Sequence, residues 1–257
     1  MKSLLALGGI LLFAASLPAQ SNTTPVLAAQ LHWGQKVSSS IATGSEYWFQ
    51  LWTVAGRSYC AEAGPFEGAV PGSGTWGDKN LDPVLDVFRS DTTTLIVQND
   101  DTDEEPYSGH LSRACWVASA ANSGPNFVRL TPFDAHVAAT VTLRFSETTL
   151  FCPWFFIAGD YNAFTLLRNT SSSPLVGVVV TWRGLNGVVA GTTTVNVPAN
   201  NGVVLNARTF VNPGAFSNGT IEIAHPGSPE QIQGSTTTLS GTTGLGFDAQ
   251  FTQRRPW

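Results

Sequence analysis

The sequence predicts an all-β protein made of two antiparallel β-sandwiches. Charged residues make up only 12% of the chain, against roughly 25% in an ordinary globular protein. Residues that favour strands and turns (Thr, Val, Gly, Asn and Ser) take their place. Short segments of alternating apolar and polar residues follow one another, each bounded by Gly, Asn, Asp, Pro or Ser, and none sustains a helical period.

The first twenty residues have the pattern of a secretory signal peptide. Lys2 precedes an apolar run from Leu4 to Leu17, and small residues precede an expected cleavage site near Ala19. The run is too short to span a bilayer, and no cysteine follows the expected cut to carry a lipid anchor. We therefore expect residues 1–19 to be removed on export from a bacterium. The product would be secreted, periplasmic or at the cell surface, without a transmembrane helix.

A first series of expected strands predicts one sandwich over residues 20–147. Alternation is visible in 84-VLDVF-88 and 126-NFVRL-130, as expected for a sheet with one buried and one wet face. This many short strands within about 110 residues is typical of a β-sandwich. The segments are YWFQLWTVAG (47–56), SYCAEAG (58–64), VLDVFRS (84–90), TTLIVQN (93–99), SRACWVAS (112–119), NFVRLTPF (126–133) and AATVTLRFSE (138–147).

A second series predicts another sandwich over residues 148–257. Asn-Gly pairs at 186–187 and 201–202 indicate hairpin turns. We place the boundary near residues 146–152, and so short a junction predicts two closely packed sandwiches. The segments are FTLLRNTSS (164–172), GVVVTWRGLNG (177–187), VVAGTTTVNVPANN (188–201), GVVLNARTF (202–210), NGTIEIAHPG (218–227), GSTTTLSGTTG (234–244) and FDAQFTQ (247–253).

Charge is distributed unevenly between the two halves. Residues 20–147 carry 14 acidic and 7 basic residues, a net charge of −7, whereas residues 148–257 carry 4 and 5, a net of +1. Net acidity without a basic patch argues against nucleic acid and against anionic membrane surfaces as partners.

Three cysteines in an exported chain allow at most one internal disulfide. Cys60 and Cys115 both lie in strand-like segments of the acidic half, so we predict that they pair. Closing this loop would contribute about 4 kcal/mol in the chain-entropy model. Cys152 lies among large apolar residues in 149-TLFCPWFF-156 and is predicted to be a buried free thiol.

An acidic cluster, 99-NDDTDEE-105, is the most concentrated charge in the chain. Its spacing resembles the start of a helix-loop-helix calcium loop, but Pro106 and Ser112 stand where that motif needs Gly and Glu, so the motif is rejected. A calcium site of another design stays open, with Asp82, Asn99, Asp100, Asp101 and Asp103 as candidate ligands. The alternatives are a solvated loop that protects a strand edge and, less favoured, a catalytic carboxylate pair.

The acidic half of the chain, residues 20–147, resembles the bacterial pre-peptidase C-terminal domain family over about 110 residues. The resemblance rests on 82-DPVLDVF-88, 97-VQNDD-101, 112-SRACWVA-118 and a last strand at 126-NFVRLTPF-133. It implies a jelly-roll-like sandwich appended to secreted enzymes. Some members of the family bind calcium, and some bind insoluble polymers. The family's Gly-Thr-Tyr-Tyr signature is missing before the last strand, where this chain has 123-SGPNFVRL-130. No enzyme domain accompanies it in this sequence.

The second half resembles an immunoglobulin-like module of uncharacterised exported bacterial proteins. The resemblance runs from 149-TLFCPWFFIAGDYNAFTLLRN-169 to 247-FDAQFTQRRPW-257. It implies a fold but no activity.

Tryptophans are numerous for a chain of this size. Trp48 and Trp52 are an even number of residues apart and would share one strand face, which we expect to fill a core. Trp33 and Trp76 lie in glycine-rich surroundings and are the candidates for ligand stacking.

The sequence contains no recognisable catalytic motif. Its four histidines are scattered, and metalloprotease, nucleophile-elbow, Cys-x-x-Cys and phosphate-loop patterns are missing. We therefore expect a non-enzymatic accessory protein for binding or adhesion to an extracellular polymer, carbohydrate or protein surface, with calcium as a candidate stabiliser. The first alternative is a structural or envelope protein without a soluble ligand, and the second is a hydrolase that uses the acidic loop. Binding predicts an aromatic or polar groove, and an enzyme predicts a pocket with perturbed carboxylates.

Overall fold

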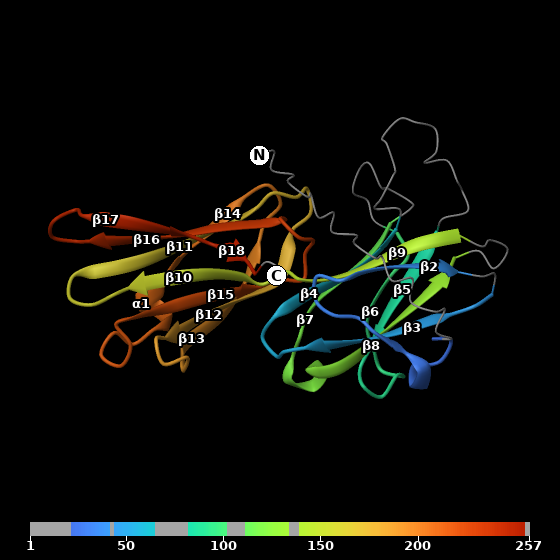
Figure 1. Cartoon of the computed structure of the whole chain (residues 1–257). Coiled ribbons are helices and arrows are strands. Elements are labelled where there is room, and N and C mark those ends of the chain that lie inside the picture. Colours follow the sequence, from blue (N-terminus) through green and yellow to red (C-terminus); the bar gives the residue numbers. More distant parts are fainter. Residues whose placement is uncertain (1–21, 42–43, 65–81, 102–110, 134–138, 255–257) are drawn as a thin grey trace, which may run out of the picture.

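The protein consists of two β-sandwiches that lie side by side (Figure 1). The structure is a computed structural model that describes residues 22–41, 44–64, 82–101, 111–133 and 139–254. Strands up to Glu147 form two sheets, and strands from Leu150 onward form two others. The predicted all-β class is therefore confirmed.

The first sandwich combines a five-stranded sheet, in the order β1-β3-β8-β5-β6, with a four-stranded sheet in the order β2-β9-β4-β7. Its pairs are antiparallel except for the two-residue strand β1, which runs parallel to β3. The strands are β1 (Ala29–Gln30), β2 (Lys36–Ile41), β3 (Tyr47–Thr53), β4 (Ser58–Gly64), β5 (Pro83–Phe88), β6 (Leu95–Asn99), β7 (Ser112–Val117), β8 (Gly124–Pro132) and β9 (Ala139–Glu147).

The second sandwich combines a five-stranded sheet, in the order β13-β12-β15-β10-β18, with a four-stranded sheet in the order β14-β11-β16-β17. All of its pairs are antiparallel. The strands are β10 (Leu150–Phe156), β11 (Tyr161–Asn169), β12 (Leu175–Gly184), β13 (Val189–Val197), β14 (Gly202–Asn206), β15 (Asn218–Ala224), β16 (Ile232–Ser240), β17 (Gly246–Gln250) and β18 (Thr252–Gln253).

Helical structure in the described residues is limited to single turns. α1 (Ala207–Phe210) begins after Asn206, whose side chain accepts a hydrogen bond from the backbone N–H of Arg208. Two 3-10 turns span Pro25–Leu27 and Ala120–Asn122. No helix in these ranges is long and apolar enough to cross a membrane.

Aromatic side chains from both sheets fill the first sandwich. Tyr59 of β4 stacks on Phe145 of β9 with ring centroids 5.5 Å apart, and Trp116 of β7 lies 6.3 Å from the same ring. Phe49 and Leu51 reach this core from the opposite sheet. Removing such apolar surface from water is the main stabilising contribution, at roughly 25 cal/mol per Å².

The expectation that Trp48 and Trp52 fill a core is corrected by the structure. Alternation along β3 turns Phe49 and Leu51 inward, so both tryptophans face outward. Trp48 is nevertheless buried, because Phe88 and the guanidinium of Arg129 cover its ring at 5.5 and 5.8 Å. Trp52, nearer the end of the strand, is 68% exposed.

The second sandwich has its own apolar core. Trp182 of β12 is completely buried and stacks on Phe210 with centroids 5.1 Å apart. Cys152 of β10 is a buried free thiol, as predicted. Burial raises the pKa of the Cys152 thiol, which keeps the side chain in its unreactive protonated form.

The Cys60–Cys115 disulfide is present, as predicted. The two cysteines stand directly opposite each other in β4 and β7, with Cα atoms 4.1 Å apart. Disulfides persist in oxidising compartments, which agrees with a location outside the cytoplasm.

The two sandwiches meet where β9 passes into β10 through Thr148 and Thr149. The N–H of Thr148 donates to the carbonyl of Ser58 at 2.8 Å, and the Ser58 N–H donates to the Thr149 hydroxyl at 2.8 Å. The connection is thus tied to the start of β4 by two hydrogen bonds.

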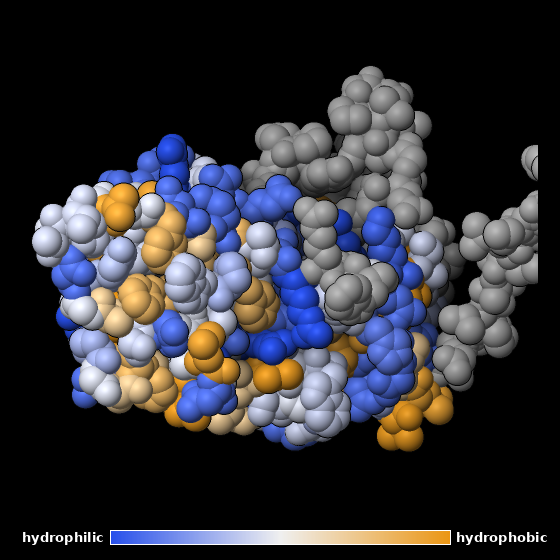
Figure 2. All heavy atoms as spheres, turned by 60° about the vertical axis from the view of Figure 1, so that its left-hand side comes forward, coloured by the Kyte–Doolittle hydropathy of each residue, from blue (hydrophilic) through white to orange (hydrophobic). Residues whose placement is uncertain are grey.

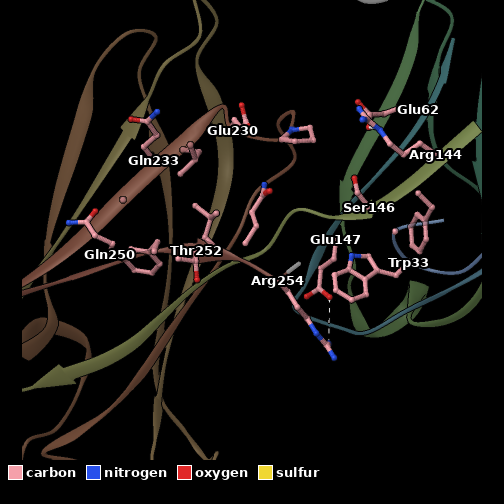
Figure 3. A pocket seen from close by; sticks show the side chains of 18 of the residues that line it. Trp33, Glu62, Arg144, Ser146, Glu147, Glu230, Gln233, Gln250, Thr252 and Arg254 are labelled. Atoms are coloured by element: carbon pink, nitrogen blue, oxygen red, sulfur yellow. Dashed lines mark hydrogen bonds and ion pairs between the residues drawn. The ribbon is translucent and has the colours of Figure 1, made fainter. Parts of the chain in front are cut away.

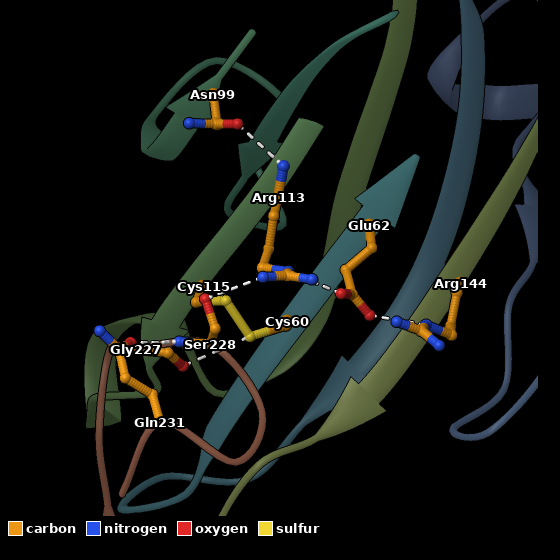
Figure 4. A network of polar contacts seen from close by, with 9 residues as sticks. All are labelled: Cys60, Glu62, Asn99, Arg113, Cys115, Arg144, Gly227, Ser228 and Gln231. Atoms are coloured by element: carbon orange, nitrogen blue, oxygen red, sulfur yellow. Dashed lines mark hydrogen bonds and ion pairs between the residues drawn. A yellow bond between two sulfur atoms is a disulfide. The ribbon is translucent and has the colours of Figure 1, made fainter. Parts of the chain in front are cut away.

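A loop of the second sandwich also rests on the outer face of the four-stranded sheet of the first (Figure 4). Arg113 of β7 donates to the Ser228 hydroxyl at 3.0 Å, and Cys60 Sγ lies 3.7 Å from the Gly227 carbonyl oxygen. Gln231 Oε1 accepts from the Ser228 N–H at 2.8 Å and so holds the loop in shape. These contacts set the spacing between the sandwiches. Whether residues 20–147 and 148–257 fold independently stays a prediction.

Candidate binding cleft

A cleft of about 1390 Å³ lies between the two sandwiches (Figure 3). Hydrophilic residues gather in a band where the sandwiches meet (Figure 2). The first sandwich contributes Trp33, Gly34, Lys36, Glu62, Arg113, Arg144, Phe145, Ser146 and Glu147; the second contributes Leu150, Leu166, Arg168, Pro229, Glu230, Ile232, Gln233, Gly234, Ser235, Gln250, Phe251, Thr252, Gln253 and Arg254. We call this space the junction cleft.

On the first sandwich, a buried ion triad shapes the junction cleft (Figure 4). Glu62 of β4 is completely buried on the outer side of its sheet. Its two carboxylate oxygens accept from Arg113 Nε at 2.7 Å and from Arg144 Nε at 2.6 Å. A buried carboxylate is tolerated only when it is paired and hydrogen-bonded in this way. The triad holds the Arg144 side chain at the cleft surface.

On the second sandwich, the outer face of β11 and β16 presents hydrogen-bonding groups to the junction cleft. Arg168 stands opposite Gln233, and Leu166 stands opposite Ser235. Glu230, just before β16, has a φ of 68°. This left-handed conformation is unfavourable for a glutamate, and such residues cluster at functional sites. Gln233 lies on the side of the cleft that the second sandwich forms (Figure 3).

Trp33, Glu147 and Arg254 meet at the base of the junction cleft (Figure 3). The Arg254 guanidinium lies 5.1 Å from the Trp33 ring centroid, and Arg254 Nη1 lies 3.9 Å from Glu147 Oε2. Arg57 Nη1 lies 3.3 Å from Glu147 Oε1 and donates a hydrogen bond to Oε2 at 3.4 Å. Arg254 follows β18 of the second sandwich, so this cluster joins the two halves.

Glu147 contributes a perturbed carboxylate to the junction cleft. Its side chain is only 4% exposed. Burial raises the pKa of the Glu147 carboxyl, and the charges of Arg57 and Arg254 offset part of the rise. The two arginine partners therefore favour the ionised form of Glu147, against the effect of burial.

Some buried polar atoms at the base of the junction cleft lack hydrogen bonds. Within the described part of the chain, no hydrogen-bond partner reaches Ser146 Oγ or Gln253 Nε2, whereas Glu147 Oε1 lies 3.3 Å from Arg57 Nη1. Most buried polar atoms in folded proteins are satisfied, so such atoms indicate a place for water or for a ligand.

The predicted calcium ligands lie elsewhere, at one end of the five-stranded sheet of the first sandwich. Leu85 pairs with Asn99, which brings Asp82 before β5 close to the end of β6. Asn99 Oδ1 accepts from the backbone N–H of Arg113 at 2.8 Å, and the Asp100 carbonyl accepts from Ser112 at 2.7 Å. These two oxygens therefore already have protein donors.

Asp101, another predicted ligand, is exposed, and Asp103 lies outside the described residues. Among the residues that are described, no group of three or more His, Cys, Asp or Glu side chains could hold a metal ion. The calcium site stays a prediction.

Of the predicted stacking tryptophans, Trp33 is half-buried at the base of the junction cleft, and Trp76 lies outside the described residues. Sequence reasoning missed Glu147, Glu230 and Arg254. The signal for Glu147 was its position at the predicted boundary, where two sandwiches must meet. Neither Glu230 nor Arg254 carries a comparable sequence signal.

Comparison with known protein families gave no match, and comparison with curated proteins gave none. Among solved structures, a tail fiber protein from an E. coli phage is 9% identical, with 89% of this chain and 38% of that chain covered and a TM-score of 0.25. A glycosyl hydrolase family 2 member from Bacteroides cellulosilyticus is 9% identical, with coverages of 80% and 28% and a TM-score of 0.23.

A beta-glucuronidase from glycoside hydrolase family 2 is 8% identical, with 80% of this chain and 23% of that chain covered and a TM-score of 0.20. This chain therefore spans well under half the length of each of these three structures. Likenesses this weak carry no argument about function.

Proposed function

We propose that this chain is an exported, non-catalytic accessory protein that binds a polymer or protein surface in the junction cleft. The observation that supports this most is the cleft itself, which combines a half-buried tryptophan with amide, hydroxyl and guanidinium groups from both sandwiches. Ligand sites occur preferentially at the interface between two domains, where a small number of polar groups fix the orientation of the ligand. The pre-peptidase C-terminal resemblance of the first sandwich is part of the same proposal.

Calcium is proposed as a stabiliser of the acidic loop rather than as part of the junction cleft. Asp82, Asn99 and Asp100 come together at one end of the first sandwich, and the carboxylates around them repel one another when no cation is present. A bound calcium ion would relieve this repulsion.

A pull-down with the full chain tests the proposal. The matrices are cellulose, chitin, calcium pectate and fibrillar collagen, each with calcium and with chelator. We expect at least one matrix to retain more of this chain than of a control protein that consists of one β-sandwich. Absence of retention on all four, with the chain folded, would contradict binding as the function.

A structural role is the first alternative, and one observation favours it. Strand β13, 189-VAGTTTVNV-197, lies at a sheet edge and contains no charged residue or proline. Natural proteins usually protect such edges, because an unprotected edge pairs with another chain. Self-association in sedimentation velocity that Thr194→Lys abolishes would support this role, and a monomer at all concentrations would exclude it.

The second alternative is a hydrolase that uses the acidic loop. A hydrolase that instead uses Glu147 is favoured by the raised pKa of this carboxyl in the junction cleft. Against it, Glu147 is only 4% exposed and paired with Arg57 and Arg254. Release of soluble sugars from the matrices above, lost in Glu147→Gln, would support this alternative. Equal release by both proteins would exclude Glu147 as the catalytic acid.

A further inference from the structure

The outer face of the five-stranded sheet in the first sandwich carries a row of aromatic side chains. Val128 packs in the core, so its neighbour Phe127 on β8 turns outward and is half-buried. Trp52 of β3 stands opposite Pro125 on the same face and is 68% exposed. Phe133, which follows β8, is 65% exposed. We call Trp52, Phe127 and Phe133 the aromatic row.

Trp52 and Phe133 lie at opposite ends of the aromatic row. The Phe133 N–H donates to the Asp82 carbonyl at 2.7 Å, which continues the pairing of β8 with β5, so the alternation of β8 extends to Phe133. From Pro125, opposite Trp52, the chain advances eight residues to Phe133, which is roughly 27 Å at about 3.4 Å per residue. A row of this length fits an extended chain better than a compact ligand.

The charged groups in the middle of the aromatic row are paired with one another. Arg129 Nε and Nη2 donate to Asp86 Oδ2 at 3.0 and 2.8 Å, and Arg129 Nη1 lies 3.6 Å from Glu46 Oε2. Trp48 Nε1 donates to the other oxygen of Glu46 at 3.0 Å. An anionic ligand would meet two carboxylates that a single arginine balances, and a cationic ligand would compete with Arg129 for them. The aromatic row therefore favours a neutral ligand.

Polar side chains separate the rings of the aromatic row. Gln50 stands opposite Phe127, and its amide accepts a hydrogen bond from Gln30. Thr131 precedes Phe133 on the outward side of β8. A dimer interface or a membrane-binding face buries a more continuous apolar surface. Flat rings set among hydroxyl and amide groups match instead the C–H faces and the hydroxyl groups of a sugar chain.

We propose that the aromatic row binds an extended, neutral polysaccharide chain, with one sugar ring stacked on Trp52 and another on Phe133. Phe127 packs against the chain between them. None of these three residues lines the junction cleft, so the aromatic row is a second site. This inference goes beyond the proposed function, which places binding in the junction cleft.

Calorimetric titration of the full chain with oligosaccharides of two lengths tests the aromatic row. The neutral probes are cellobiose and cellohexaose, and N-acetylated chitobiose and chitohexaose; hexagalacturonate is the anionic probe. A hexasaccharide can reach both exposed rings, whereas a disaccharide reaches only one. We expect at least one neutral hexasaccharide to bind about tenfold or more tightly than its disaccharide and than hexagalacturonate. The inference is overturned if neither neutral hexasaccharide binds, or if hexagalacturonate binds as tightly as the better of the two.

Variants then locate the site. Trp52→Ala and Phe133→Ala are each expected to weaken the neutral hexasaccharide about fivefold or more and to remove most of its advantage over the disaccharide. Trp52→Phe keeps a flat ring and should retain binding even if Trp52→Ala fails to fold. The matched control is Trp154→Ala, since Trp154 is 41% exposed but lies in the second sandwich. Unchanged hexasaccharide affinity in folded Trp52→Ala and Phe133→Ala would overturn the inference.

Two further measurements identify other occupants. Hexasaccharide binding that persists in Ser235→Trp, which fills the junction cleft, supports the aromatic row. If Ser235→Trp abolishes this binding and Trp52→Ala does not, the sugar binds in the junction cleft, and the inference fails while the proposed function stands. If the wild type dimerises in sedimentation velocity and Trp52→Ala is a monomer, the aromatic row is an interface between two copies, and the inference fails.

Discussion

The guanidinium of Arg254, which follows the last strand of the second sandwich, lies 5.1 Å from the ring of Trp33 in the first. The same arginine lies 3.9 Å from Glu147, whose charge it partly balances. One exposed side chain therefore covers the aromatic ring of the junction cleft and stabilises its buried carboxylate.

Removing Arg254 should raise the pKa of Glu147 further. Burial already raises this pKa, and Arg254 is one of the two cations that oppose the rise. In Arg254→Ala the Glu147 carboxyl should therefore titrate at a higher pH than in the wild type, as followed by carbon-13 NMR. The control is Arg183→Ala, because Arg183 pairs with the distant Glu222 at 2.7 Å. An identical Glu147 titration in both variants would show that Arg254 does not reach the carboxylate in solution.

Acidification should destabilise the fold through His225. This histidine is completely buried, and a backbone contact with Thr148 offsets only part of the effect of burial on its pKa. Burial lowers the pKa of His225 from 6.5 to about 4. The unfolded chain therefore binds the proton more readily, and stability falls as the pH drops from about 6.5 to about 4, by up to about 3 kcal/mol.

Glu147 acts in the opposite sense, because a raised carboxyl pKa makes the folded state gain stability as the pH falls through that pKa. The test is therefore the difference in unfolding free energy between the wild type and His225→Phe across this pH range, by urea denaturation. The slope attributed to His225 should vanish in His225→Phe and persist in His32→Phe, where the replaced histidine is exposed. If the pH dependence of the unfolding free energy is unchanged in His225→Phe, groups other than His225 cause it.

The two sandwiches are predicted to fold separately. A fragment of residues 20–146 and a fragment of residues 148–257 should each give β-type circular dichroism and a cooperative melt. The two apolar cores share no residue, which is the physical reason. If neither fragment folds alone, the contacts of Arg113 and Ser58 across the junction are essential and the four sheets form one unit.

Calcium should raise the melting temperature if the acidic loop binds it. The stabilisation follows RT ln(1 + [L]/Kd), about 2.7 kcal/mol at a hundredfold excess over Kd. Asp100→Asn or Asp101→Asn should abolish the gain without loss of stability in chelator, because each removes a repelling charge. Asp91→Asn is the control, since Asp91 caps a separate turn through Thr93 and Thr94. If millimolar calcium leaves the melting temperature unchanged, the acidic loop does not bind calcium and is a solvated loop.

The fold class and the disulfide were predictable because both depend on local patterns. Alternation within a strand decides which side chains turn inward, and Cys60 and Cys115 stood in strands of the same half. Alternation alone does not say which face is the core, and this is why Trp48 and Trp52 were misplaced. Their face is the outer one, and Trp48 is buried there by Phe88 and Arg129.

The junction cleft was not predictable, because it arises from the packing of one sandwich against the other. Trp33 was singled out for its glycine-rich surroundings, but its neighbours Glu147 and Arg254 are 114 and 221 residues away in the sequence. Contacts such as those of the Gly227–Ser228 segment with Cys60 and Arg113 bring the two sets together.

The most direct test of the binding function is to fill the junction cleft and leave the rest of the surface unchanged. Ser235 and Thr237 lie on the same face of β16, but of the two only Ser235 lines the cleft. Affinity for the retained matrix would be measured by depletion isotherms for Ser235→Trp and Thr237→Trp. We expect Ser235→Trp to lose about tenfold or more in affinity and Thr237→Trp to bind like the wild type. Equal binding by both folded variants would contradict binding in the junction cleft.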